Sequence, residues 1–189
     1  MGLLGLKYGN ALNGRAGTTR IRGWLLGGTY GFNWQISSFV IGFEGDISGT
    51  GIKRNFMSVA PGFAGFCPFT IPCRTDLRWF GTDRARLGYA WDRLLFYGTA
   101  GIAYGQVRGT LLTPGFTVGQ TTRTGFVYGG GIEFALASNW SAKAEYLHTD
   151  FGDKPTYGTA AAPLVESVSF KRFNIFRAGL NYRFDWPRW

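Results

Sequence analysis

The stretch RAGLNYRF, residues 177–184, alternates polar and apolar side chains. Successive side chains of a β-strand point to opposite sides, so this alternation predicts a strand with two very different faces. The pattern alone does not reveal which of the two faces meets water. One face holds Arg177, Asn181 and Arg183, and the opposite face holds Leu180, Tyr182 and Phe184.

The same alternation recurs along most of the chain. Short turns are predicted near residues 34–38, 91–93 and 137–139, and long loops near 49–76, 108–122 and 151–169. An up-and-down β-barrel typically has short turns at one rim and long loops at the other. The alternation of short and long connections therefore favours this fold. The predicted strands cover residues 22–35, 39–48, 79–91, 94–107, 124–136, 140–150 and 170–184.

Three features favour a membrane barrel over a soluble one. The polar face of the strands is sparse and rich in glycine, as expected for a narrow interior rather than a solvated exterior. The strands are about 10–14 residues long, which suits a tilted crossing of a bilayer. Aromatic residues also gather at strand ends, as they do at membrane interfaces. These aromatic residues are Trp24, Trp34, Trp79, Trp91, Tyr97, Tyr104, Trp140 and Tyr182.

The composition narrows the class of protein further. The 189 residues suffice for one domain, and 30 glycines with only 16% charged residues are unusual for a soluble globular protein. The net charge of +9 comes from single basic residues rather than a run, which argues against nucleic-acid binding. No stretch approaches 18 apolar residues, so the sequence predicts no transmembrane helix.

Four stretches carry a resemblance to a known family. The chain resembles the small outer-membrane β-barrel proteins of alphaproteobacteria, the porin-family or outer-membrane immunogenic protein group, and is similar to the eight-stranded barrel of the outer-membrane protein A type. This implies a location in the cell outer membrane and a lipid environment. The stretches are FVIGFEGDISGTGI (39–52), RARLGYAWDRLLFYGTAGIAYG (84–105), TRTGFVYGGGIEFALASNWSAKAEYLHTDFG (122–152) and FRAGLNYRF (176–184).

The resemblance also assigns a role to the last strand. It implies that Arg177, Gly179, Tyr182 and Phe184 form a terminal signal read by the barrel-assembly machinery. The family pattern normally ends at the chain terminus, whereas here DWPRW follows. Residues 185–189 are therefore expected to form a short periplasmic tail.

The family has eight strands, and seven are evident from the pattern. The segment LLGLKYG (3–9) alternates in the same manner, so residues 1–12 are expected to hold part of a first strand. We expect that the chain begins inside this strand, and a fragment or a misassigned start would explain why no signal peptide precedes it. Residues 1–189 are then one barrel domain.

Charged residues that share one face of their strands, which we call the lumen parity, are predicted to line the barrel lumen. Opposite charges in such a narrow interior would pair, because a lone buried charge is costly. Two interpretations stay open: a gated ion path, or a structural plug that sets strand register. The residues are Glu44, Asp46, Arg84, Arg86, Glu133, Lys143, Glu145, Arg177 and Arg183.

Four further residues, His148, Asp83, Cys67 and Cys73, each suggest a specific role. His148 shares the outward parity of Tyr146, without a serine at a convincing spacing, so an interfacial role is favoured over catalysis. Asp83 has lipid-facing parity, which suggests either a local bulge that turns it inward or a partner at the rim. Cys67 and Cys73 favour a disulfide over free thiols, closing a small loop worth about 2 kcal/mol at most.

These observations predict a structural outer-membrane barrel that supports membrane integrity and presents surface loops to a possible ligand. No enzymatic activity, cofactor or metal site is predicted, and no nucleic-acid partner. The alternatives are a small nonspecific channel, a lipid-modifying barrel enzyme and a soluble lipocalin-like binder.

Overall fold

The structure, a computed structural model, describes residues 2–9, 16–56, 73–111, 117–152 and 167–184. The described residues form ten β-segments and no helix long and apolar enough to cross a membrane. Trp24 alone separates β2 from β3, and two residues separate β4 from β5, so the ten segments make eight runs of strand. The segments are β1 (Gly2–Gly9), β2 (Ala16–Gly23), β3 (Leu25–Ile36), β4 (Phe39–Thr50), β5 (Lys53–Phe56), β6 (Cys73–Trp91), β7 (Leu94–Leu111), β8 (Thr117–Ala135), β9 (Trp140–Asp150) and β10 (Ser167–Tyr182).

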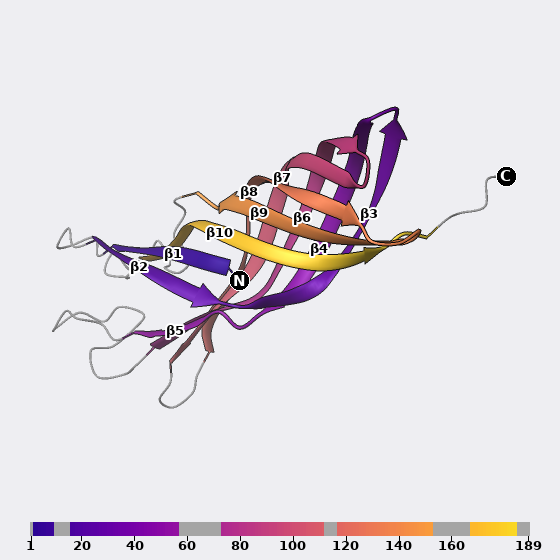
Figure 1. Cartoon of the computed structure of the whole chain (residues 1–189). Helices are drawn as coiled ribbons and strands as arrows, with labels where there is room; N and C mark the ends of the chain where they lie inside the picture. The colour runs from indigo at the N-terminus through magenta and orange to yellow at the C-terminus, as the bar shows by residue number, and fades with distance from the viewer. Residues whose placement is uncertain (1, 10–15, 57–72, 112–116, 153–166, 185–189) are drawn as a thin grey trace, which may run out of the picture.

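The segments form one antiparallel sheet in the order β2-β1-β10-β9-β8-β7-β6-β4-β3, with β5 paired to β6. Each strand run therefore lies beside its neighbours in the chain, as in the predicted up-and-down barrel, and β1 pairs with both β2 and β10 (Figure 1). Because β2 and β3 are one bent strand, the two ends of the sheet meet at Trp24. There the amide of Gly51 donates a hydrogen bond to the Trp24 carbonyl (3.0 Å).

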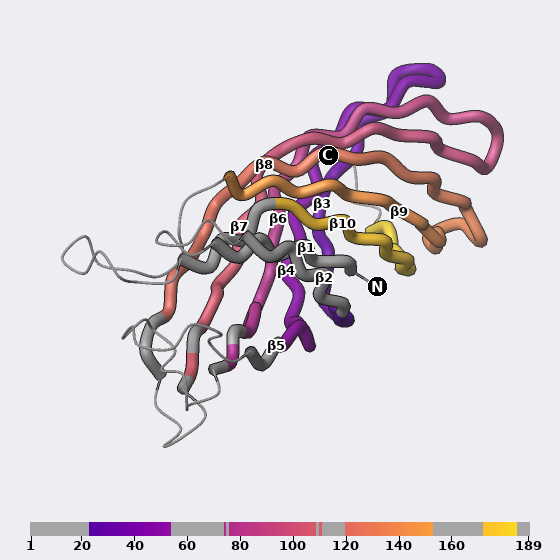
Figure 2. Tube along the Cα trace, turned by 90° about the vertical axis from the view of Figure 1, so that its left-hand side faces the viewer, coloured from indigo at the N-terminus to yellow at the C-terminus, as the bar shows by residue number. Residues whose placement is uncertain are grey.

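Tight turns gather at one end of the sheet, which we call the turn end (Figures 1 and 2). Ser37 and Asp92 each begin a two-residue turn with a positive φ, 55° and 53° respectively. Positive φ at this position matches the twist of the flanking strands, and aspartate tolerates it better than most residues. The opposite end, which we call the loop end, holds the longer connections between strands.

The turn-end half of the barrel is open along one side. β1 reaches only to Gly2, which pairs with Gly23 and Ile175. Beyond that point, among the described residues, β3 pairs only with β4, and residues 176–182 of β10 pair only with β9. The side chains of Thr29, Asn33 and Gln35 are consequently exposed, although they share the lumen-facing parity.

The outer wall of the barrel is apolar, as predicted for a membrane protein. Leu26, Trp34 and Phe126 on the outer face are 76%, 74% and 74% exposed, whereas the charged residues Glu44 and Arg84 at lumen parity are 6% and 1% exposed. An all-round belt of exposed large apolar side chains would be unfavourable in water and is favourable in lipid. The inside-out distribution of polarity argues against the soluble lipocalin-like alternative.

The strands at the loop end extend further than the sequence pattern indicated. β5 lies inside the loop expected at 49–76, β6 begins at Cys73, β7 continues to Leu111 and β8 begins at Thr117. The expected loop boundaries there were wrong. Backbone pairing continues beyond the lipid belt, where the outer face no longer needs apolar side chains and the alternation used to delimit the strands disappears.

Candidate functional site in the barrel lumen

Strand register brings opposite charges together inside the barrel. Glu44 of β4 lies opposite Arg84 of β6, and Glu145 of β9 lies opposite Arg177 of β10. Glu133 of β8 likewise lies opposite a cation, Lys143 of β9. Directly opposed residues of an antiparallel pair on one face are close enough for their side chains to interact. Five strands therefore deliver charges of both signs to one level of the lumen.

Arg84 lies at the centre of this cluster and is fully buried. One of its terminal nitrogens, Nη2, lies 2.7 Å from Oε1 of Glu44 and 3.1 Å from Oδ2 of Asp46. The other, Nη1, lies 2.8 Å from Oε1 of Glu145. The planar guanidinium thus binds three carboxylates from two strands that do not pair with each other.

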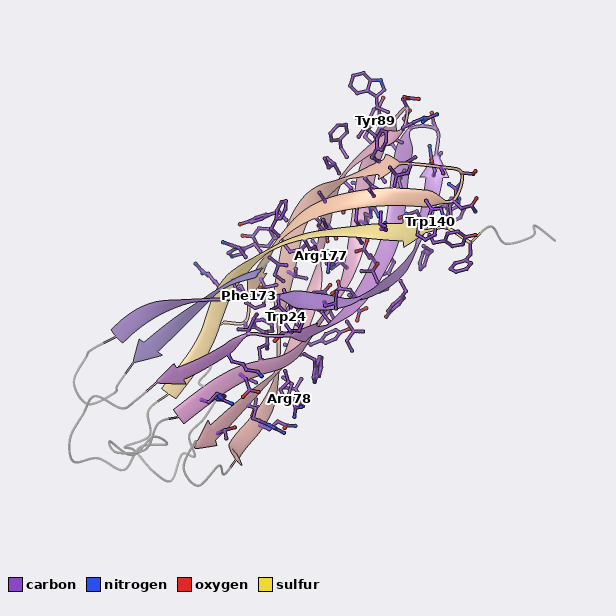
Figure 3. All side chains as sticks on the ribbon, turned by 60° about the horizontal axis from the view of Figure 1, so that its bottom comes forward. Trp24, Arg78, Tyr89, Trp140, Phe173 and Arg177 are labelled. Atoms are coloured by element: carbon purple, nitrogen blue, oxygen red, sulfur yellow. The ribbon has the colours of Figure 1, made fainter. Side chains whose placement is uncertain are left out.

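Arg177 binds the same three carboxylates from the opposite side of the lumen. Its Nε, Nη1 and Nη2 atoms lie 2.6 Å from Glu145, 3.0 Å from Asp46 and 3.2 Å from Glu44. Figure 3 labels Arg177 midway along the barrel. It comes from β10, and Arg84 comes from β6, so the shared carboxylates connect two walls of the barrel.

The cluster continues toward the turn end through Arg86, Lys143 and Glu133. Lys143 Nζ lies 2.7 Å from Glu44, and Arg86 forms ion pairs with Glu44 (3.5 Å) and with Glu133. Ser141 and Asn181 also donate hydrogen bonds to Glu133. We call the following eight side chains the charge layer: Glu44, Asp46, Arg84, Arg86, Glu133, Lys143, Glu145 and Arg177.

The charge layer contains four acids and four bases, so it is neutral when all members are ionised. Hydroxyl groups add further contacts: Thr82 donates to Asp46, and Tyr97 donates to Glu145 at 3.3 Å. The Arg86 guanidinium also lies 3.8 Å from the centre of the Tyr97 ring, a favourable cation–π geometry. A buried, neutral and mutually bonded cluster is held in place because separating any pair would leave an uncompensated charge.

An apolar layer fills the lumen on the loop-end side of the charge layer. Phe80 of β6 packs edge-to-face against Phe173 of β10, with ring centres 5.3 Å apart, and Phe151 stacks on Phe173 at 5.7 Å. These rings span the lumen between opposite walls. The buried members of this apolar layer are Ile52, Leu77, Phe80, Ala103, Val107, Val127, Leu147, Phe173 and Ile175.

The remaining predicted site residues lie outside both layers. Arg183 sits at the turn end, where its Nη2 donates to the Ser138 carbonyl (3.0 Å). Tyr182 and Phe184 face outward and pack edge-to-face with ring centres 4.9 Å apart, and Tyr182 also packs against Trp140 (5.1 Å). Gly179 is exposed on β10. Cys73 begins β6, but Cys67 lies outside the described residues, so the disulfide stays a prediction.

Asp83 faces outward without any register shift beside it. The hydroxyls of Tyr104 and Tyr30 donate to its carboxylate at 3.0 and 3.4 Å. Gly45 makes room for this arrangement, because a Cβ there would lie 2.5 Å from the Tyr30 ring. A bulge does not turn Asp83 inward; two outward tyrosines supply its partners instead.

His148 also has a neighbour that the sequence did not suggest. Its Nδ1 lies 2.7 Å from Oδ1 of Asn174, and its ring centre lies 5.1 Å from that of Tyr128. Among the described residues, no three histidines, cysteines or acids are grouped to hold a metal ion. The histidine therefore belongs to an outward-facing hydrogen-bonded pair.

Sequence reasoning missed the apolar layer and the hydroxyl partners of the acids. A signal was present, because residues 94–107 are apolar at both parities, and a strand apolar on both faces predicts apolar contacts inside as well as outside. The hydroxyl contacts carried no comparable signal. Thr82 meets Asp46 only because the register of β6 and β4 sets them opposite each other, and Tyr97 of β7 reaches Glu145 of β9, which is not its neighbouring strand.

Comparison with known proteins places the chain among outer-membrane proteins. Residues 2–184 match the family model described as an outer membrane protein beta-barrel domain. The chain is 37% identical over 161 residues to the 31 kDa outer-membrane immunogenic protein of Brucella melitensis, covering 82% of this chain and 63% of that protein. It is 28% identical over 183 residues to the 25 kDa outer-membrane immunogenic protein of the same species, covering 96% and 75%.

A solved structure shares the fold. Ail, the attachment invasion locus protein of Yersinia pestis, solved in complex with the heparin analogue sucrose octasulfate, superposes with a TM-score of 0.50. The match covers 97% of this chain and 94% of that chain at 14% sequence identity, so the likeness concerns the fold alone.

Proposed function

Since its residues 2–184 match the family model, the chain belongs to the outer membrane protein β-barrel family, and we propose that it serves the outer membrane as a structural barrel with a sealed lumen. The chain spans 63% of the length of its 31 kDa relative, so the role is proposed for the barrel. It requires neither a catalytic group nor a conducting pore.

The observation that carries this proposal is the pair of layers across the lumen. An ion crossing the barrel would have to separate the buried pairs of the charge layer and then pass the packed rings of Phe80 and Phe173. Separating buried pairs is strongly unfavourable, and an apolar constriction excludes water as well as ions. Two successive barriers of different chemistry favour a plug over the gated ion path.

The second part of the proposed role, the presentation of surface loops, concerns the loop end of the barrel. Outer-membrane barrels have short turns on the periplasmic side and longer loops on the extracellular side. The two-residue turns at Ser37 and Asp92 mark the periplasmic side on this basis. We propose that the rigid barrel holds the longer connections outside the cell, where they are available to a surface ligand.

Conductance distinguishes the plug from the channel. The refolded protein is expected to give no regular steps in planar bilayers, and the double variant F80A/F173A, which removes both central rings, is expected to give brief openings. The matched control is F176A, because Phe176 is an outward ring on the same strand, 59% exposed. Regular steps from the unaltered protein would establish the channel alternative.

A lipid-modifying activity is tested separately. The refolded barrel is incubated with lipid A, and the lipid is analysed by mass spectrometry. The structural role predicts an unchanged mass, while a change that disappears in the H148A variant would identify an enzyme.

A further inference from the structure

A basic area lies on the outer wall at the loop end, just beyond the apolar belt. We call it the basic ledge and define it by Lys53 of β5, Arg74 and Arg78 of β6 and Arg108 of β7. One acid, Asp76, lies among these four cations, and Asp83 lies further along β6 on the same outer wall. Figure 3 shows Arg78 at the loop end, away from Tyr89 and Trp140 at the turn end.

Burial of their chain neighbours places these side chains outside. Ile52, Leu77 and Val107 are buried in the apolar layer, so the next residues, Lys53, Asp76 and Arg108, point to the outer wall by alternation. Strand register then aligns them, because Asp76 pairs with Lys53 on one side and with Arg108 on the other. The ledge is therefore a continuous row across three strands.

A β-bulge adds Arg78 to this wall. Leu77 pairs with Val107 and Trp79 with Gln106, which leaves Arg78 as an extra residue without a partner position. Because Leu77 and Phe80 are both buried in the lumen, the two residues between them both project outward. Strict alternation would have turned one of them inward, so the bulge keeps an exposed arginine directly beside Trp79.

The ledge begins where the lipid belt ends. Trp79 packs edge-to-face on Tyr104, with ring centres 5.9 Å apart, and aromatic pairs of this kind mark a membrane interface. Ile102 lies on the turn-end side of this pair and is exposed, whereas Gln106 and Arg108 follow on the loop-end side. Arg108 lies four residues beyond Tyr104, about 13 Å along the tilted strand at about 3.3 Å per residue, which places it on the headgroup side of the aromatic pair.

We propose that the basic ledge binds the phosphate groups of lipids in the outer leaflet, the acyl chains of which lie against the adjacent Trp79–Tyr104 pair. The four cations against one acid give the ledge an excess of positive charge, in contrast to the neutral charge layer in the lumen. Cations beside an apolar belt attract anionic lipid headgroups at about 1 kcal/mol for each arginine or lysine. Lys53 and Arg78 are exposed and Arg108 is half-buried, so the exposed side chains of the ledge are open to a phosphate group that approaches from the lipid.

A lipid partner fits better than a soluble polyanion because the cations lie directly beside the Trp79–Tyr104 pair, so that one surface offers both charge and apolar contact. A soluble anion would use only the charges, whereas a phosphorylated lipid contacts both surfaces. This inference rests on the location of the barrel in the outer membrane and on the proposed extracellular orientation of the loop end. It is independent of the sealed lumen proposed above, so conductance does not bear on it.

The test compares bisphosphorylated lipid A with its dephosphorylated form. The full chain is refolded in zwitterionic micelles, folding is checked by the heat-dependent shift of its band on a gel, and the apparent Kd is measured by titration. We expect binding that requires the phosphates and weakens as NaCl is raised. The R78Q variant is expected to bind about fivefold more weakly and R78Q/R108Q about 30-fold more weakly, from two contributions of the size given above.

The matched control is R93Q, because Arg93 is an exposed arginine at the turn end, and its Kd is expected to be unchanged. R78Q removes only an exposed side chain on a bulge, so the test remains valid if the double variant fails to fold. Equal binding of dephosphorylated lipid A, or an unchanged Kd in R78Q, would overturn the proposal. Tighter binding of a short heparin fragment than of lipid A, lost in R78Q, would overturn it in favour of a soluble polyanion.

Discussion

Arg84 of β6 and Arg177 of β10 bind the same three carboxylates, those of Glu44, Asp46 and Glu145. The two strands are not neighbours, since β7, β8 and β9 lie between them in the sheet. Backbone hydrogen bonds join only adjacent strands, so the shared carboxylates supply a connection across the lumen that the sheet itself lacks. This bridge makes the register of distant strands interdependent.

Loss of Arg84 is expected to destabilise the barrel strongly. The R84Q variant leaves Glu145 and Glu44 with fewer cationic partners in a buried site, and breaking such a network costs about 3–5 kcal/mol. The measurement is the free energy of unfolding in urea for the protein refolded into lipid vesicles.

The control for this prediction is R172Q. Arg172 also forms an ion pair, with Asp150 at 2.8 Å, but its side chain is 67% exposed, so its loss is expected to cost less than about 1 kcal/mol. Similar losses in R84Q and R172Q would contradict the importance assigned to burial of the charge layer.

Neutralising Asp83 is expected to leave the barrel unharmed or to stabilise it by up to about 1 kcal/mol, because an acid on the lipid-facing wall near the interface is mildly unfavourable. The amide oxygen of D83N still accepts hydrogen bonds from Tyr30 and Tyr104. The comparison is with D92N in the exposed turn, where no change is expected. A marked destabilisation by D83N alone would mean that the charge itself has a role, and urea unfolding in vesicles measures the difference.

Glycine at position 129 is expected to be required by close packing of β8 against β9. A Cβ there would lie 2.0 Å from the Tyr146 carbonyl oxygen and 3.0 Å from a Leu147 side-chain carbon, and overpacking of this kind costs about 1–3 kcal/mol. G129A should therefore lower the unfolding free energy. G28A is the control, because a Cβ at Gly28 would meet nothing within 4 Å, and equal stability of the two variants would refute the packing argument.

Phe184 is expected to matter more for assembly in cells than for stability in isolation. If residues 177–184 are read by the barrel-assembly machinery, F184A should reduce the amount of protein in the outer membrane several-fold while its unfolding in vesicles changes little. W91A is the control, because Trp91 is another outward ring at the turn end, 71% exposed. Assembly that is impaired equally in both variants would reduce the effect to a general loss of interfacial aromatics.

The alternation of residues in the sequence is enough to predict the strands, their two faces and the membrane setting. Alternation within single strands is a local property, so residues 140–150 could be delimited as they occur in β9. The sequence also predicted that the apolar face points outward, because aromatic residues at strand ends are typical of a membrane interface. Boundaries failed only at the loop end, where Cys73 and Thr117 begin strands that no apolar pattern marks.

Which side chains meet inside the barrel could not be predicted from the alternation and depends on the three-dimensional fold. Arg183 has the same parity as Arg177, yet it lies six residues further along the chain, at the turn end and beyond the charge layer. The hydrogen bonds of Asp83 likewise depend on how neighbouring strands are aligned, and the contact of Phe80 with Phe173 joins strands far apart in the chain. Parity specifies a direction from each strand. Distances across a barrel depend on the register of all the strands together, including the bulge at Arg78, and that register is a property of the whole sheet.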